Sequence, residues 1–239
     1  PPRYQHRTNL LDLQKDPDKL KKLKGKELVT RLLQQMTENW KDSDRQPSKM
    51  NWRFTKQLKI DPRNPSLEKT LEKSIVAITD DTWVNQVPVA SGLVSAEADR
   101  KRAIDLVHRN APGHYEFIEL KIDEGAGSPL FAAIKILLYG LVYVFSRKNM
   151  KALGYTEDVE LLTAESVELQ VLAPEAYYKE DSLDWLQNAI SSGLTALSKD
   201  PAWNIDFKLR FRFKAFPPKF KWERWNFELM NALDGISDL

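Results

Sequence analysis

Hydrophobic and polar positions follow two periods along this chain, and these periods outline its elements. Apolar residues alternate with basic ones over 205–216, as Phe207, Lys208, Leu209, Arg210, Phe211, Arg212, Phe213 and Lys214. Alternation of period two is typical of a strand that buries one face. Shorter apolar runs predict four more strands, at residues 83–90, 102–109, 115–122 and 167–172.

Apolar residues at helical spacing predict four helices, at residues 9–40, 66–78, 129–147 and 182–198. Ser66 is suited to cap the second helix, and Asp181 or Ser182 the fourth. Gly25 is a point at which the first helix would break in two. An aromatic tail at 217–233 is expected to end in a short packed helix.

The order of these elements predicts the fold class. The turn at 110–113 is expected to join two strands into a hairpin, and the helix at 129–147 then leads to a further strand. A long helix between strands is a crossover connection. We therefore expect an α/β fold with a mixed central sheet flanked by helices.

Two polar segments predict how the chain is divided. The linker at 41–51 and the Pro-rich segment at 61–66 contain many helix-breaking residues. They indicate an N-terminal helical extension at 1–60 and a main domain at 61–239, which includes the last strand and the aromatic tail.

Charge is unevenly distributed, although the whole chain has a net charge of only +2. Residues 1–60 sum to +8 and residues 61–200 to −8. Such asymmetry indicates contact with nucleic acid, or it is an ordinary solvated surface of mixed charge. The chain has no Cys, which excludes disulfides, thiolate zinc sites and a cysteine nucleophile.

No membrane segment is expected. The most apolar stretch, 129–145, is shorter than the roughly 20 residues of a membrane span and contains Lys135. A helix buried against a sheet explains it better. No apolar signal segment follows the first residues, so a cytoplasmic location is the expectation.

Three polar side chains in two neighbouring predicted strands indicate a chemical site. Asp105 interrupts an apolar strand, where a carboxylate is costly unless it is paired or bound to a metal. Glu119 and Lys121 lie two positions apart, so they share one face of the next strand. Pairing through the turn at 110–113 would bring Asp105 beside Glu119.

The residue types indicate phosphodiester chemistry. Two adjacent carboxylates repel each other, and a hard cation such as Mg²⁺, or Mn²⁺, relieves that repulsion. A metal-bound water has a lowered pKa and becomes a better nucleophile. Lys121 would orient or deprotonate that water, or stabilise charge on the phosphate.

These residues resemble a known motif. Asp105, a gap of 13 residues, and then Glu119, Leu120 and Lys121 are similar to the motif of the PD-(D/E)XK nuclease superfamily. The resemblance covers about residues 66–172 and implies a restriction-endonuclease-like sheet. It also implies a metal-dependent nuclease acting on DNA, with Asp105, Glu119 and Lys121 as catalytic residues.

The same resemblance implies further ligands. An acid on the first helix of the domain often helps to bind the metal, and here Glu72, or Glu68 one turn earlier, fills that place. The Leu120 carbonyl would be another metal ligand, beside Asp105 and Glu119. The helix after this strand often carries a Gln or a basic residue near the site, and this chain offers Lys135, which is also a candidate for nucleic-acid contact, and Tyr139.

The chain departs from the family pattern at two points. Ile104 precedes the motif acid where the pattern has Pro, which is a common variation. The helix carries Lys135 and no Gln, which leaves the subgroup of the superfamily undetermined.

Each candidate has a structural alternative. Glu119 and Lys121 would form a routine ion pair, Asp105 a salt bridge with Arg102, and Lys135 would only pack along the helix. The four cations at 208–214 would follow a phosphate backbone, or form a wet face that deters edge pairing: Lys208, Arg210, Arg212 and Lys214. Trp222 and Trp225 would stack on bases or belong to a core.

Two classes of function follow. The first is Mg²⁺-dependent hydrolysis of DNA by a PD-(D/E)XK-type nuclease, with a homodimer as one arrangement of such enzymes. The second is a catalytically inactive binding or assembly module that keeps the nuclease fold. Substrate form and sequence specificity are not encoded in any pattern that we recognise.

Overall fold

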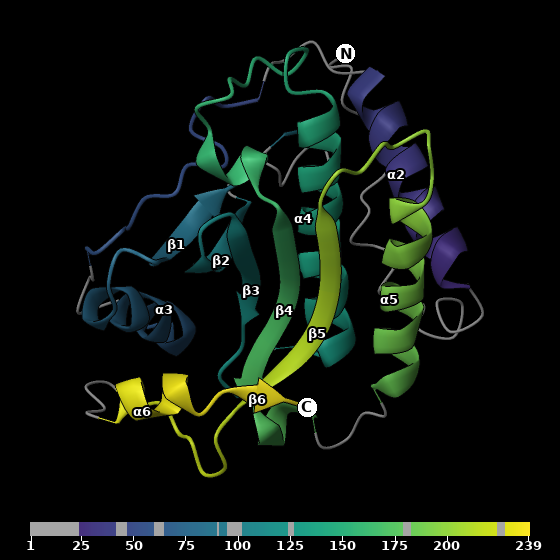
Figure 1. The fold of residues 1–239 in the computed structure, drawn as a ribbon. Helices are drawn as coiled ribbons and strands as arrows, with labels where there is room; N and C mark the ends of the chain where they lie inside the picture. The colour runs from purple at the N-terminus through teal and green to yellow at the C-terminus, as the bar shows by residue number, and fades with distance from the viewer. Residues whose placement is uncertain are drawn as a thin grey trace.

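One six-stranded mixed sheet organises the protein, with strands in the order β1-β2-β3-β4-β5-β6 (Figure 1). The computed structural model describes residues 24–41, 47–59, 65–89, 91–94, 102–123, 127–178, 183–223 and 228–239. The strands are β1 (Trp83–Pro88), β2 (Ala103–Ala111), β3 (His114–Leu120), β4 (Ser166–Pro174), β5 (Lys208–Phe216) and β6 (Ser237–Asp238).

Helices flank both faces of this sheet, which confirms the predicted α/β class. They are α2 (Gly25–Lys41), α3 (Leu67–Ile78), α4 (Pro129–Lys148), α5 (Asp184–Ser198) and α6 (Leu229–Asp234), with the 3-10 helices η4 (Glu160–Thr163) and η5 (Glu175–Tyr178). The main hydrophobic core joins α2, α4 and α5 to the sheet. A smaller core joins α3 and α6 to the opposite face (Figure 1).

The connections between the strands include both the predicted hairpin and the predicted crossover. Strands β1, β2 and β3 form an antiparallel meander, and Gly113 takes a positive φ of 75° in the β2–β3 turn. Helix α4 then carries the chain to β4, which lies parallel to β3, and α5 carries it to β5, parallel to β4. The end of β3 and the first turns of α4 are therefore neighbours at one end of the sheet.

Most predicted elements are present with shifted ends. Ser66 caps α3 as predicted, because its Oγ accepts a hydrogen bond from Lys69 N at 3.2 Å. Strand β5 begins at Lys208 and not at 205, and α5 begins at Asp184 without a side-chain cap. The predicted caps Asp181 and Ser182 lie outside the described residues.

The described part of the N-terminal segment is built into the main core. Helix α2 begins at Gly25, where a break was predicted, and residues 9–23 of that predicted helix lie outside the described ranges. A Cβ added at Gly25 would lie 1.9 Å from the Ala189 carbonyl oxygen, and one at Gly193 2.5 Å from the Gly25 oxygen. Two glycines thus allow α2 and α5 to touch backbone to backbone. The predicted division at residue 60 also falls outside the described ranges.

Helix α4 is the central element of the main core. It is long and apolar enough to cross a membrane by length and composition alone, but 83% of its most apolar window is buried within the protein. This confirms the expectation of a core helix. Gly140 lets β4 approach closely, because an added Cβ would lie 2.4 Å from a Leu169 methyl group.

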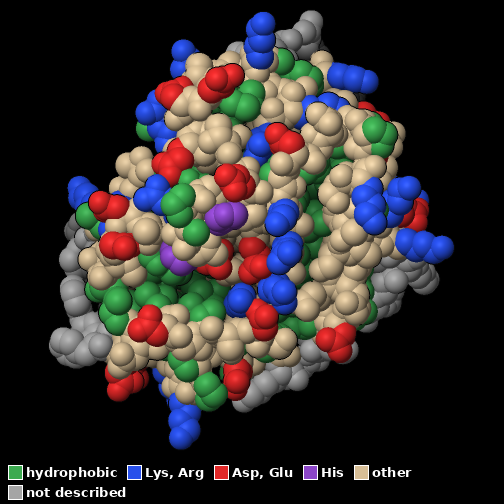
Figure 2. Space-filling model, viewed as in Figure 1, with side chains coloured by type: hydrophobic (Ala, Val, Ile, Leu, Met, Phe, Trp, Pro, Cys, Tyr) green, Lys and Arg blue, Asp and Glu red, His purple; other side chains and the backbone are tan. Residues whose placement is uncertain are grey.

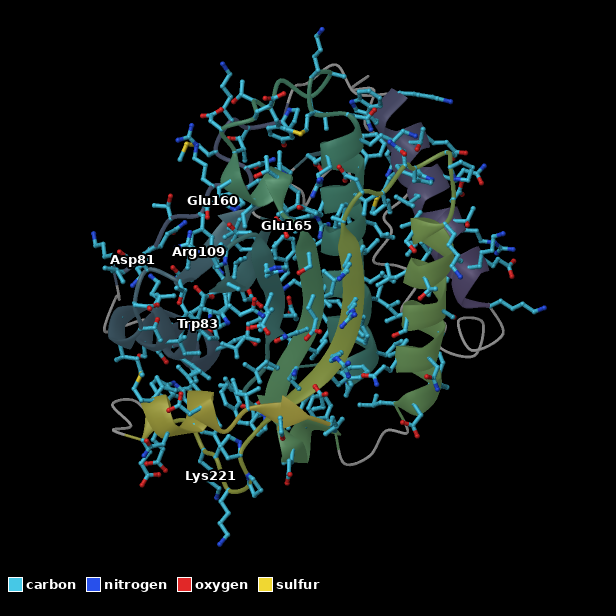
Figure 3. All side chains as sticks on the ribbon, viewed as in Figure 1. Asp81, Trp83, Arg109, Glu160, Glu165 and Lys221 are labelled. Atoms are coloured by element: carbon cyan, nitrogen blue, oxygen red, sulfur yellow. The ribbon has the colours of Figure 1, made fainter. Side chains whose placement is uncertain are left out.

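Side chains also tie η4 to the meander. Arg109 of β2 ion-pairs with Glu160 at 2.6 Å, and Figure 3 shows these two residues at the same end of the sheet. The Tyr115 hydroxyl donates to the same Glu160 carboxylate at 2.5 Å. This contact fixes the connection between α4 and β4.

Candidate functional site

Strands β2 and β3 bring Asp105 and Glu119 together, as the sequence predicts. Their register pairs Leu106 with Ile118, and one step further places Asp105 opposite Glu119. Both side chains are buried, and Asp105 Oδ2 accepts a hydrogen bond from Leu120 N at 3.3 Å. Two carboxyl groups therefore lie in one water-poor region at the end of the sheet.

Lys121 follows directly after β3 and folds back over the end of the strand. Its Nζ donates to Glu119 Oε1 at 2.7 Å and to the Leu120 carbonyl at 2.8 Å. A third contact reaches Glu68 Oε2 of α3 at 3.2 Å. The lysine, one motif carboxylate and the Leu120 carbonyl are thus in direct contact.

Helix α4 contributes Lys135 from its second turn. Lys135 Nζ lies 2.7 Å from both Oε1 and Oε2 of Glu119 and 3.7 Å from Asp105 Oδ2. Its hydrogen bond goes to Oε1, so among the described residues Oε2 has an ion-pair contact but no hydrogen bond. The Lys135 ammonium also lies 5.8 Å from the centre of the Tyr139 ring.

Helix α3 contributes Glu72 and, unexpectedly, Lys69. Glu72 is fully buried, and its Oε2 lies 2.7 Å from Lys69 Nζ. The same ammonium lies 3.4 Å from Asp105 Oδ1, so Lys69 joins the helix acid to the strand acid. Asn85 Nδ2 and Gln86 Nε2 each donate to Glu72 at 2.8 Å.

Acids and lysines alternate along the whole site. Each of three ammonium groups joins two carboxylates, in the order Glu68, Lys121, Glu119, Lys135, Asp105, Lys69 and Glu72. Four acids face three lysines, so the fully ionised network carries one net negative charge. Lys69, Lys135 and Glu68 are its partly exposed members, with 31%, 20% and 23% of their side chains accessible. They form the side of the network that meets solvent.

The backbone of β1 is adapted to this network. Neighbouring strand residues normally point to opposite faces, but Asn85 and Gln86 both donate to Glu72. Gln86 achieves this with a φ of 50°, in the left-handed region. Such a conformation costs a non-glycine residue about 1–3 kcal/mol and is concentrated at functional sites.

The lysines and the burial act in opposite directions on the acids. Burial raises the pKa of Glu72 to about 7, against the opposing effect of Lys69. Burial and the Asp105 charge raise the pKa of Glu119 to about 7. Burial acts in the same direction on Asp105, but the charges of Lys135, Lys69 and Lys121 outweigh it and lower the Asp105 pKa. Neighbouring acids with separated pKa values are a common property of catalytic sites.

The lysines are held in their charged form. Burial lowers the pKa of Lys121, but Glu119, Asp105 and Glu68 outweigh burial and raise it above its usual value. The carboxylates likewise raise the pKa of Lys69 and Lys135 despite burial. All three are therefore cations at neutral pH.

Three contributors to the site were not predicted from the sequence. Lys69 looks like one of the exposed lysines that decorate α3, and its position three residues before Glu72 is the only local signal. Asn85 and Gln86 stand in a predicted strand, where polar residues are unremarkable. Two adjacent amides in a short apolar strand beside Val84 and Val87 were the available hint.

The basic row of β5 lies away from this network. Lys208 and Arg210 are exposed, and blue side chains follow β5 on the face shown in Figure 2. Arg212 lies 3.5 Å from Glu168 and 3.1 Å from Asp238, and Lys214 lies 2.7 Å from Asp238. Half of the row is therefore neutralised by neighbouring acids.

The remaining aromatic candidate is structural. Trp222 is buried in the smaller core, and its indole Nε1 donates to Thr70 Oγ1 at 3.0 Å. Of the two roles predicted for Trp222, the structure therefore shows the core position and not base stacking. Trp225 lies outside the described residues.

The donors at this site suit a hard divalent cation in their chemistry. The Asp105 and Glu119 side chains and the Leu120 carbonyl offer only oxygen atoms, which Mg²⁺ prefers, and at Glu119 Oε2 the Lys135 ammonium lies 2.7 Å away. Within the described residues, no three His, Cys, Asp or Glu side chains are already arranged around one metal position. The ammonium groups stand between the acids instead, so binding a metal requires at least one lysine to move.

Comparison of the chain with protein-family models, curated proteins and solved structures found no match in any of the three.

Proposed function

We propose that this protein is a divalent-metal-dependent nuclease that hydrolyses phosphodiester bonds in DNA, with a fold and site of PD-(D/E)XK type. The observation that carries the proposal is the convergence of Asp105, Glu119 and Lys121 at the end of β2 and β3. The order α3, β1–β3, α4 and β4, with β4 parallel to β3, supports the restriction-endonuclease-like fold that the motif implies.

The proposed metal ligands are Asp105, Glu119 and the Leu120 carbonyl. Glu72 is favoured over Glu68 as a third acid, because it shares the Lys69 ammonium with Asp105. Glu68 instead contacts Lys121. When bound, a divalent cation supplies Lewis-acid chemistry to the scissile phosphate.

Lys121 acts by charge in this proposal. Its pKa is raised by Glu119, Asp105 and Glu68 in spite of burial, so the amine does not accept a proton at neutral pH. A fixed ammonium beside the Leu120 carbonyl is suited to orient the attacking water by hydrogen bonding. It is also suited to stabilise negative charge that develops on the phosphate.

One observation favours a second candidate function. The carboxylates of the site are paired with ammonium groups from the same chain, so most of their charge is balanced without a metal. This supports an inactive binding or assembly module that keeps the nuclease fold. The two candidates differ in whether Mg²⁺ or Mn²⁺ enters the site.

The test is DNA cleavage together with metal binding. Purified protein is incubated with supercoiled, linear duplex, single-stranded and branched DNA, in Mg²⁺ or Mn²⁺. We expect cleavage by the wild type and a loss of at least about a hundredfold for Asp105→Ala and Lys121→Ala. Lys151→Ala, in the exposed turn after α4, is the matched control and keeps full activity.

Two results would overturn the nuclease proposal. One is a wild-type protein that cuts none of these substrates and whose melting temperature does not change with Mn²⁺. The other is cleavage that survives in Asp105→Ala, which would assign the activity to a contaminant or to another site. A folded protein without metal binding or cleavage would favour the inactive module.

A further inference from the structure

The outer edge of β5 is only partly paired. Strand β6 pairs with Lys214 and Ala215 alone. Strand β4 pairs with the inner side of β5, but in the described part of the chain no strand pairs with its outer side from Lys208 to Arg212. An unpaired strand edge offers a row of backbone donors and acceptors to another chain.

The direction of the free backbone groups follows from the ladder. Lys208 N donates inward to the Glu165 carbonyl, so even-numbered residues of β5 bond to β4. Odd-numbered residues therefore direct their backbone outward. Phe213 shows this, since its N–H donates to Gln187 Oε1 and its carbonyl accepts from Leu239 N. Phe211 and Leu209 present the same groups one and two steps further along the edge.

The pairing of β6 with β5 shows which kind of side chain faces the basic row from a neighbouring strand. Asp238 of β6 stands opposite Lys214 and lies 2.7 Å from its ammonium and 3.1 Å from the Arg212 guanidinium. An acid on an antiparallel strand thus neutralises two members of the basic row at once. At this end of β5, the same strand therefore pairs with the backbone edge and neutralises the basic side chains.

The unpaired end repeats the pattern without its acids. Lys208 and Arg210 are exposed, and neither forms an ion pair with a described residue. On the other face of the strand, Phe211 is buried and Leu209 is half-buried against the main core. Figure 2 shows a hollow with hydrophobic side chains between β5 and α5, alongside the cations.

We propose that the free edge of β5 binds an acidic, extended peptide segment of a partner protein by antiparallel strand addition. The peptide carries Asp or Glu at alternate positions, which face Arg210 and Lys208, as Asp238 faces Lys214. Its intervening positions are apolar and lie on the side of Leu209 and Phe211. Main-chain hydrogen bonds supply affinity and alternate side chains supply specificity in this mode of recognition.

A second copy of this chain fits the edge less well. An antiparallel β5–β5 pairing across a two-fold axis would place the basic rows of both copies side by side, and like charges opposite each other are destabilising. DNA would use the cations but not the outward N–H groups of Leu209 and Phe211. These differences separate the occupants experimentally.

The first test uses a labelled ten-residue peptide of alternating Glu and Val, with an alternating Lys and Val peptide as the charge control. Fluorescence anisotropy with the full chain is expected to show saturable binding of the acidic peptide alone. Hydrogen exchange of the complex is expected to show new protection at the Leu209 and Phe211 amides. Absence of that protection overturns strand addition, whatever the affinity.

Variants then separate charge from edge pairing. Lys208→Glu with Arg210→Glu should weaken peptide binding by about tenfold or more. Leu209→Pro should do the same, since it removes an outward N–H and no bond to β4. Lys199→Glu, at the exposed end of α5, is the control and leaves affinity unchanged. Circular dichroism establishes that each variant is folded.

Two outcomes contradict the proposal. If the charge variant abolishes binding and a folded Leu209→Pro does not change it, the surface recognises charge alone. If a single-stranded oligonucleotide displaces the peptide and protects no β5 amide, nucleic acid is the occupant. Neither outcome depends on cleavage of DNA, so the nuclease proposal stands or fails separately.

Discussion

Lys135 Nζ lies 2.7 Å from both carboxylate oxygens of Glu119, and the two residues belong to consecutive elements, α4 and β3. The contact fixes the first turns of the central helix to the end of the strand that carries the motif. It also places a permanent cation against an acid that is proposed to bind a metal.

Lys135→Met should destabilise the fold strongly. The substitution keeps the apolar stem but leaves Glu119 buried with Lys121 as its remaining cation, and breaking a buried pair typically costs about 3–5 kcal/mol. Urea unfolding measures the change in free energy. Lys151→Met in the exposed turn after α4 should stay within about 0.5 kcal/mol of wild type. Equal stabilities for the two variants would contradict the pairing.

Lys69→Met should raise the affinity for Mn²⁺ if the site binds metal. Lys69 is the most exposed of the three lysines and stands between Glu72 and Asp105, where it opposes an incoming cation. Unit charges 4 Å apart interact by about 4 kcal/mol at an intermediate dielectric, so we expect at least about tenfold tighter binding. Calorimetric titration with Mn²⁺ measures it.

The control for this prediction is Lys73→Met, one turn later on α3. Its ammonium contacts the Lys59 carbonyl and not the acids of the site, so its Mn²⁺ affinity should equal that of wild type. Metal binding by wild type that Lys69→Met leaves unchanged would show that Lys69 does not compete. An absence of binding in every protein would count against the metal site itself.

Glu72 should make stability fall as pH rises towards neutrality. Burial raises the pKa of Glu72 from 4.5 to about 7. Between these values the folded state keeps a proton that the unfolded chain has released, so this contribution is complete below pH 4.5 and is lost by about pH 7. The slope reaches about 1.4 kcal/mol per pH unit for one proton.

Glu72→Gln removes this titration while keeping a hydrogen-bonding side chain. The stability of the variant relative to wild type should therefore improve as pH rises through the same window. Denaturant unfolding at half-unit pH steps gives the difference, and exposed Glu157→Gln is the control. Parallel pH profiles for wild type and Glu72→Gln would exclude a raised pKa at this carboxyl.

At position 86, a glycine substitution should leave the protein more stable than an alanine substitution. Both substitutions lose the hydrogen bond to Glu72, but at a φ of 50° alanine keeps the backbone strain. We expect Gln86→Gly to be more stable than Gln86→Ala by about 1 kcal/mol. At Glu168, in a regular part of β4, the order should reverse. Thermal unfolding compares the four proteins, and an identical order at both positions would refute the strain.

The sequence predicted an element well wherever a single local property of the chain determines its conformation. The alternation of β5, the Ser66 cap of α3 and the turn at Gly113 each express a local preference of the chain. The contact of Asp105 with the end of β3 was also within reach, because a hairpin fixes register.

Contacts between residues far apart in the sequence could not be predicted. Lys69 meets Asp105 across 36 positions, and no spacing rule links a residue on a helix to one on a distant strand. Strand β6 has two exposed residues and no alternating pattern, so its pairing with β5 depends wholly on the tertiary fold. The left-handed Gln86 was hidden for a similar reason, since glutamine carries no preference for a positive φ.

The burial of α4 also has a consequence for how the protein is made. Helix α4 is complete at Lys148, whereas β5, which helps to close the main core, ends at Phe216. At about 5–20 residues per second the ribosome needs roughly 3–14 s to add those residues. Throughout this interval the nascent chain presents a membrane-like segment with part of its cover still unsynthesised. We expect ribosome-bound chains arrested near residue 190, in which α4 has left the exit tunnel, to recruit chaperones or membranes more strongly than the full chain tethered through a long C-terminal linker, which ribosome pelleting can measure.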